Sequence, residues 1–66
     1  MVRVTIVNPE KKVMEIRDVK TVMDVLKRLN LNPDAYIAFV NGRPVPEDEN
    51  IEGYDELDLM QVFSGG

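Results

Sequence analysis

The stretch that decides the fold is TVMDVLKRLNLNP, residues 21–33. Its apolar residues recur with a period of about 3.6 and form one stripe, made of Val22, Val25, Leu26 and Leu29. Thr21 is placed to cap the first turn, and Asp24, three residues later, to return the hydrogen bond as in a capping box. Asn30 suits the left-handed position that ends a helix, and Pro33 prevents continuation. The stretch therefore predicts one short helix.

Two strands are expected before this helix. Residues 2–6, VRVTI, alternate apolar and polar side chains and are rich in β-branched residues, which is typical of a half-buried strand. Residues 8–11 supply a turn, since they contain an Asn-Pro pair. Residues 12–17 form the second strand, with Met14 and Ile16 on one face. The two strands are expected to pair as a hairpin.

A second hairpin is expected after the helix. Residues 36–40, YIAFV, read as a third strand. Asn41 and Gly42 follow it, and both tolerate the positive φ that a tight turn requires. Residues 43–46 contain two prolines, which cannot donate to a ladder, so they form only a short edge strand.

The last part of the chain completes the sheet. Residues 47–55 form a polar loop pinned by Ile51, and residues 57–63 form the final strand. With one helix between two hairpin-like units, we expect the first and last strands to be central and parallel. The expected fold class is α+β, a β-grasp with a mixed four- to five-stranded sheet and one helix across one face. Residues 1–63 form a single domain, and residues 64–66 a flexible C-terminal tail.

The composition argues against an enzyme. The chain has 66 residues, enough for one core, and contains neither cysteine nor histidine. Ser64 is the only serine, so a nucleophile with a proton-exchanging base is missing. The densest acidic run, Glu47 to Glu49, lacks the glycine-punctuated pattern of a calcium loop and reads as a solvated loop. We expect neither a catalytic site nor a bound metal or cofactor.

Charge and hydropathy restrict the partners. The net charge is −4, and the basic residues are scattered, whereas nucleic-acid binding needs a clustered basic face. No apolar run approaches the roughly 20 residues of a membrane span. The N-terminus also lacks the pattern of a signal peptide. We therefore expect a cytoplasmic protein that binds neither nucleic acid nor membrane.

One apolar patch is expected on the sheet. Strand alternation places Leu57 and Leu59 on one face and Met60 and Val62 on the other, which Phe39 shares. If the helix covers the face of the two leucines, then Phe39, Met60 and Val62 stay uncovered and form a docking surface. The alternative is that long charged side chains or a loop cover this patch.

The chain ends in Gly65 and Gly66. Two terminal glycines arise by chance in about one sequence in two hundred, from a glycine frequency of about 7%. A frayed end or a cloning remnant is the alternative explanation. A Gly-Gly end is thin enough to enter a narrow catalytic channel, because it has no Cβ. Its carboxylate is ionised at neutral pH, with a reference pKa of about 3.5, and is able to attack the α-phosphate of ATP.

The whole chain resembles the ThiS/MoaD family of ubiquitin-like sulfur carriers. The resemblance is carried by the element order and by three segments: VNGRPVP at residues 40–46, DELDL at residues 55–59 and FSGG at residues 63–66. It implies that a ubiquitin-activating-type adenylyltransferase consumes ATP to adenylate Gly66, which then becomes a thiocarboxylate. A synthase accepts the sulfur. Phe39 and Met60 match positions that contact the activating enzyme in the family.

The resemblance leaves several pathways open. The Asn-Gly-x-x-Val-Pro segment and the short chain favour the thiazole branch of thiamine synthesis. The Phe-Ser-Gly-Gly ending also suits the molybdopterin branch, although the double proline that often precedes that tail is replaced by Gln61-Val62. Modifiers joined to lysines and carriers for tRNA thiolation share the same ending. A β-grasp interaction module with an incidental Gly-Gly is the remaining alternative.

Overall fold

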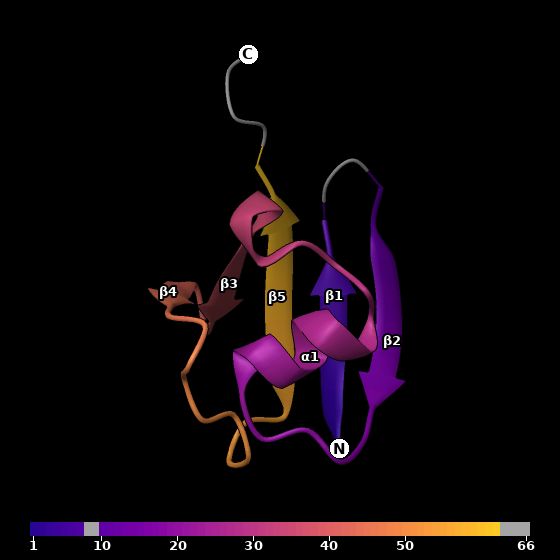
Figure 1. The fold of residues 1–66 in the computed structure, drawn as a ribbon. Coiled ribbons are helices and arrows are strands. Elements are labelled where there is room, and N and C mark those ends of the chain that lie inside the picture. Colours follow the sequence, from indigo (N-terminus) through magenta and orange to yellow (C-terminus); the bar gives the residue numbers. More distant parts are fainter. Residues whose placement is uncertain (8–9, 63–66) are drawn as a thin grey trace.

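A computed structural model describes residues 1–7 and 10–62 (Figure 1). Their elements follow the order β1 (Val2–Ile6), β2 (Lys12–Ile16), α1 (Val22–Arg28), the 3-10 helix η1 (Pro33–Ala35), β3 (Tyr36–Val40), β4 (Arg43–Val45) and β5 (Glu56–Gln61). The strands form one five-stranded sheet with the order β2-β1-β5-β3-β4. This mixed sheet with one α-helix is the ubiquitin-like β-grasp that the sequence predicts.

The centre of the sheet is the parallel pair of β1 and β5. Val4 lies opposite Leu57 in this pair, and Ile6 lies opposite Leu59. The other neighbouring strands, β1 with β2, β5 with β3 and β3 with β4, are antiparallel. The first and last strands are therefore central and parallel, as expected.

The ends of α1 follow the predicted capping pattern. The backbone N–H of Asp24 donates to the Thr21 hydroxyl at 3.2 Å, and the N–H of Thr21 donates to the Asp24 carboxylate at 3.1 Å. At the other end Asn30 has a φ of 59°, and the N–H of Leu31 donates to the carbonyl of Leu26 at 2.8 Å. Together with a bond from the Asn30 N–H to the Lys27 carbonyl, this is a Schellman ending.

Asp24 does more than cap the helix. Its carboxylate also accepts a hydrogen bond from the backbone N–H of Lys20 at 3.0 Å. The N–H groups of Lys20 and then Thr21 stabilise the ionised form and hold the pKa of Asp24 below its usual value of 3.8. The helix start is therefore anchored to the preceding loop by an ionised side chain.

The core lies between α1 and one face of the sheet. Figure 1 shows α1 crossing in front of β5 and β1. Among the described residues the buried ones are all apolar: Val2, Val4, Ile6, Ile16, Val22, Val25, Leu26, Ala38, Val40, Ile51, Leu57 and Leu59. Leu57 and Leu59 thus face the helix, and Ile51 pins the long loop as predicted.

The second hairpin turns at Asn41 and Gly42. Their φ angles are 53° and 79°, and Val40 pairs with Arg43 directly across the turn. A two-residue turn of this kind matches the twist of its strands, but it requires positive φ at both positions. The predicted turn pair and the short proline-containing edge strand β4 are both confirmed.

A few boundaries differ from the expectation. Strand β2 ends at Ile16 rather than at residue 17, and Asp18 adopts a positive φ of 62° just after it. Strand β5 starts earlier, at Glu56, because that residue pairs with Arg3, and it ends at Gln61. The 3-10 helix η1 was not expected; the Asn32 side chain caps it by accepting from the N–H of Asp34 at 3.0 Å. The predicted turn at residues 8–11 falls partly outside the described residues.

Leu59→Ala is expected to lower the free energy of unfolding by roughly 2–5 kcal/mol, the usual cost of a cavity at a buried leucine. Leu59 is fully buried between the sheet and α1. Denaturant unfolding measures the change. The neighbouring exposed Asp58 supplies the control, because Asp58→Ala should change the value by less than about 0.5 kcal/mol. Equal losses in the two variants would contradict the assignment of faces.

Asp24→Asn is expected to destabilise the protein at neutral pH, with an effect that shrinks in acid. Because the folded-state pKa is lowered, the carboxylate contributes stability above the unfolded value of 3.8. That contribution is lost as the pH falls through the lower folded value. Thermal unfolding of the parent and the variant between neutral pH and strong acid checks this. A difference that stays constant over this range would show that charge at Asp24 is unimportant.

Candidate docking face and the end of the last strand

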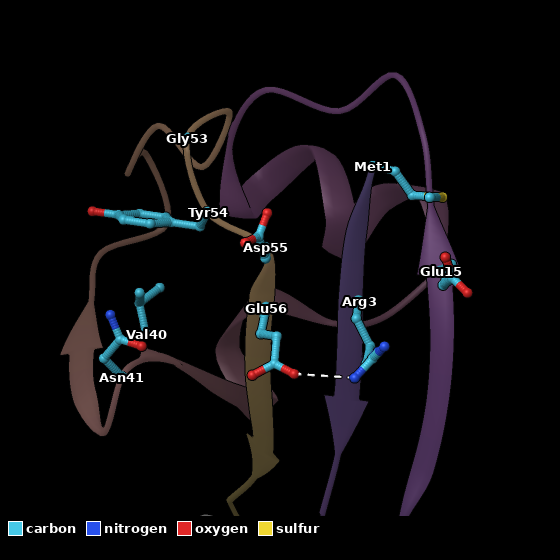
Figure 2. Close-up of a pocket in the computed structure, with 9 residues that line it drawn as sticks. All are labelled: Met1, Arg3, Glu15, Val40, Asn41, Gly53, Tyr54, Asp55 and Glu56. Carbon is cyan, nitrogen blue, oxygen red and sulfur yellow. Dashed lines mark hydrogen bonds and ion pairs between the residues drawn. The ribbon is translucent and has the colours of Figure 1, made fainter.

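The sheet face turned away from α1, which we call the open face, is covered by no other element of the described residues. Side chains on it form rows across the strands, which the register defines. The row nearest the start of β1 is charged: Arg3 lies opposite Glu15 on β2 and Glu56 on β5. Figure 2 shows the Arg3 guanidinium turned toward Glu56, at 3.2 Å from its carboxylate. Both side chains are more than half exposed, so this ion pair adds little stability.

A pocket of about 560 Å³ lies at this charged end (Figure 2). Its walls are largely polar and include Asn41 from the hairpin turn and Tyr54 from the loop before β5. The Tyr54 hydroxyl is already engaged, since it donates to the Glu49 carboxylate at 3.2 Å. Arg3 is engaged with Glu56. The pocket therefore offers no concentrated apolar surface for a partner.

The middle row of the open face is mixed. Thr5 lies opposite Val13 and Asp58, and Phe39 lies between Asp58 and Pro44. Phe39 is partly buried, whereas Val13 is 54% exposed at the far edge. Phe39 thus lies on the open face, as the alternation predicted, and its neighbours there are on β5 and β4.

The row nearest the end of β5 is apolar. Met60 lies directly opposite Ile37 in the antiparallel pair of β5 and β3. Ile37 is 40% exposed, and Val7, whose N–H donates to the Leu59 carbonyl at 3.0 Å, is 46% exposed. Residue Val62 continues beyond β5 and donates its N–H to the Ala35 carbonyl at 2.8 Å. Exposed apolar side chains therefore gather where the chain leads on to its last residues.

Of the residues selected from the sequence, the structure places Phe39 and Met60 on the open face, and Val62 is half-buried just after β5. Their role in docking stays a prediction. The predicted handle, Gly65 and Gly66, lies outside the described residues, as does the rest of the tail.

The patch expected from the sequence contained neither Ile37 nor the exposed Val7 and Val13. Alternation along residues 36–40 places Ile37 on the same face as Phe39. What was missing was the register, which sets Ile37 beside Met60 and leaves both at the apolar end. Cross-strand neighbours of this kind lie about 5 Å apart at Cβ, so Ile37 and Met60 act as one surface.

Two findings concern absences in residues 1–7 and 10–62. No group of three or more acidic side chains in this part of the chain is arranged to hold a metal ion. The same residues contain no helix with the length and apolar character needed to cross a membrane.

A family model and several known proteins match this chain. The sequence model of the family "small archaeal modifier protein 2" matches residues 1–63. Small archaeal modifier protein 2 of Haloferax volcanii is 32% identical over 65 residues, which cover 98% of this chain and 97% of that protein. Sulfur carrier protein TtuB of Thermus thermophilus is 28% identical over 64 residues, which cover 97% and 98% of the two chains. Both likenesses therefore extend over all the elements of the fold.

Proposed function

Because the chain belongs to the small archaeal modifier protein 2 family, a group of small ubiquitin-fold carriers and modifiers, we propose that it carries sulfur on the carboxyl group of Gly66. The observation that carries this proposal is the position of the apolar row of the open face, at the end of β5 that leads toward Gly66. A partner that binds this row is held beside Val62, from which the chain continues to Gly66. The apolar row and the carboxyl group of Gly66 are then used by the same enzyme.

The proposed chemistry takes place on the partner. A carboxylate oxygen of Gly66 attacks the α-phosphorus of ATP, which forms an acyl-adenylate and releases pyrophosphate. Hydrosulfide then attacks the acyl carbon and displaces AMP, which leaves a thiocarboxylate. The partner is a ubiquitin-activating-type adenylyltransferase that consumes the ATP, and a sulfur-accepting synthase takes the product. The chain itself, which lacks histidine and cysteine, is a substrate in these steps and needs no bound cofactor.

We propose that the activating enzyme docks on the patch formed by Ile37, Phe39, Met60 and Val62. An aromatic ring beside a flexible methionine suits an interface, because aromatic residues concentrate in hot spots and methionine adapts its shape. The half-exposed state of this patch means that covering it removes apolar surface from water. The charged row around Arg3 then lies at the opposite end of the open face, away from the tail.

A second candidate function is favoured by the family description, which names modifier proteins. In this case the same adenylate reacts with the ε-amine of a lysine on a target protein and leaves an isopeptide bond. Activation and docking are shared with the sulfur-carrier proposal. Only the nucleophile that attacks the activated Gly66 differs.

The molecule that accepts the sulfur stays a prediction from the sequence. The family resemblance predicts an acceptor in the thiazole or the molybdopterin branch, and tRNA thiolation is the alternative. The names of the two relatives specify a modifier and a sulfur carrier, but no acceptor. A cytoplasmic location is part of the same proposal.

Deletion of Gly66 is expected to abolish activation and leave the fold intact, because a terminal residue contributes few packing contacts. The measurement is the intact mass after incubation with ATP, the activating enzyme and a sulfur source. For the parent protein we expect the mass gain of one oxygen replaced by sulfur, and none for the deleted variant. High-mass conjugates in the parent would favour the modifier. An unchanged mass would favour a plain interaction module, and a large fall in the thermal midpoint of the variant would show a packed tail.

Phe39→Asp and Met60→Asp are each expected to weaken binding to the activating enzyme by about 2 kcal/mol or more, or about thirtyfold. The loss of folding stability should be much smaller than for Leu59→Ala, since both side chains are already partly in water. Calorimetry measures the affinity, and denaturant unfolding measures the stability of the same variants.

Val13→Asp is the matched control for these two variants. Val13 lies on the same open face and is 54% exposed, but it is on β2, at the edge far from β3. Its substitution should leave the affinity unchanged. Equal weakening by all three variants would indicate that the whole face is covered. Normal binding of the Phe39 and Met60 variants would show that the tail supplies recognition alone.

A further inference from the structure

The helix α1 is too short to cover the whole sheet. Its seven residues rise about 10 Å, whereas five strands spaced about 4.8 Å apart make a sheet about 19 Å wide. Figure 1 shows α1 over β5 and β1, with β3 and β4 beside it. On the side of β3 and β4, the face that carries the core therefore extends beyond the helix.

This uncovered part forms a groove of about 670 Å³ between α1 and the β3-β4 hairpin. It is lined mainly by apolar side chains, among them Met23, Leu26, Tyr36, Ala38 and Val45. Leu26 and Ala38 are buried, whereas Met23, Tyr36 and Val45 are only partly covered. The groove is deep at Ala38 because the alanine side chain is small. A leucine at this position would project into the groove.

One rim of the groove is acidic. Glu47 and Asp48 line it, and the backbone holds their loop in place, since the N–H of Met23 donates to the Glu47 carbonyl at 2.8 Å. Both side chains are exposed, and neither makes an ion pair or a side-chain hydrogen bond with any residue that the structure describes. Asp24, nearby on α1, is by contrast occupied by backbone N–H groups. The rim therefore presents two carboxylates without a counter-charge.

The part of the chain that supplies β3, β4 and the acidic loop is predominantly acidic. Residues 31–66 contain eight of the twelve acidic residues of the chain but, of its eight basic residues, only Arg43. The rest of the basic residues lie in residues 1–30. A ligand that approaches β3, β4 and the acidic loop thus meets a negative potential, which attracts a cationic partner.

We propose that this groove binds a short basic peptide segment of a partner protein, with one large apolar side chain as its anchor. The anchor enters over Ala38, where Met23 adapts to its shape, and flanking lysines or arginines pair with Glu47 and Asp48. The groove lies on the helix side of the sheet, whereas Phe39 and Met60 lie on the open face; of the proposed docking patch, Ile37 also lines the groove. The proposal therefore goes beyond the proposed function and assigns the chain a second partner, which contacts the helix side of the sheet.

The test is a ¹⁵N-¹H NMR titration of the protein with the capped heptapeptide GRKFKRG. We expect saturable shifts at Met23, Leu26, Ala38 and Val45. Two control peptides separate the contributions: GRKAKRG lacks the anchor, and GEEFEEG reverses the charge. Each should bind at least about tenfold more weakly than the parent peptide.

Two kinds of variant test the site itself. The double variant Glu47→Gln, Asp48→Asn removes exposed charges without touching the core and should weaken the peptide at least about fivefold. Ala38→Leu fills the groove and should abolish binding, with its folding checked by circular dichroism. Met60→Asp alters only the opposite face and should bind the peptide as the parent does, even if it no longer binds the activating enzyme.

Several outcomes would overturn the proposal. These are shifts at Phe39 and Met60 instead of the groove, equal binding of the acidic peptide, an undiminished affinity of the double variant, or no saturation at millimolar peptide. If Ala38→Leu does not fold, the double variant decides alone. If the peptide does not bind but Gly66 is activated normally, the groove proposal is wrong and the proposed function still holds.

Discussion

The parallel pairing of β1 with β5 is the constraint on which the rest of the molecule depends. Parallel neighbours need a crossover connection, because a tight turn can join only antiparallel strands. Here the connection from β1 to β5 contains all the remaining elements of the described residues: β2, α1, η1, β3 and β4. Since the helix lies over the central pair, Leu57 and Leu59 are fully covered. All other strands take their place relative to these two.

This arrangement gives the two faces of the sheet different properties. One face is dry under α1, and its buried residues are all apolar within the described part of the chain. The other face changes from charged at Arg3 to apolar at Met60 along the direction of β5. In the proposed function, the open face binds the activating enzyme while the face under α1 holds the core. Separating the two tasks between faces allows a substitution to affect one of them without the other.

Local rules account for the parts of the fold that the sequence predicted well. Thr21, Asp24 and Asn30 act through bonds within a few residues, and the turn at Asn41 and Gly42 depends on their own φ angles. Alternation sufficed to place Leu59 inside and Met60 outside. The pairing of Ile37 with Met60 and the early start of β5 depend on register between strands distant in sequence. The groove over Ala38 depends on the helix length relative to the sheet width. No local sequence pattern predicts that ratio.

The central position of β5 also has a consequence for synthesis. The N-terminal hairpin and α1 emerge first, but neither can bury its apolar side chains until Leu57 and Leu59 arrive. Closing the contact between β1 and β5 joins residues more than fifty positions apart, which is a slow kind of contact to form. A chain that stops before residue 56 therefore has no core and is exposed to proteases and aggregation. A chain that has formed this core has therefore been translated at least through Leu59.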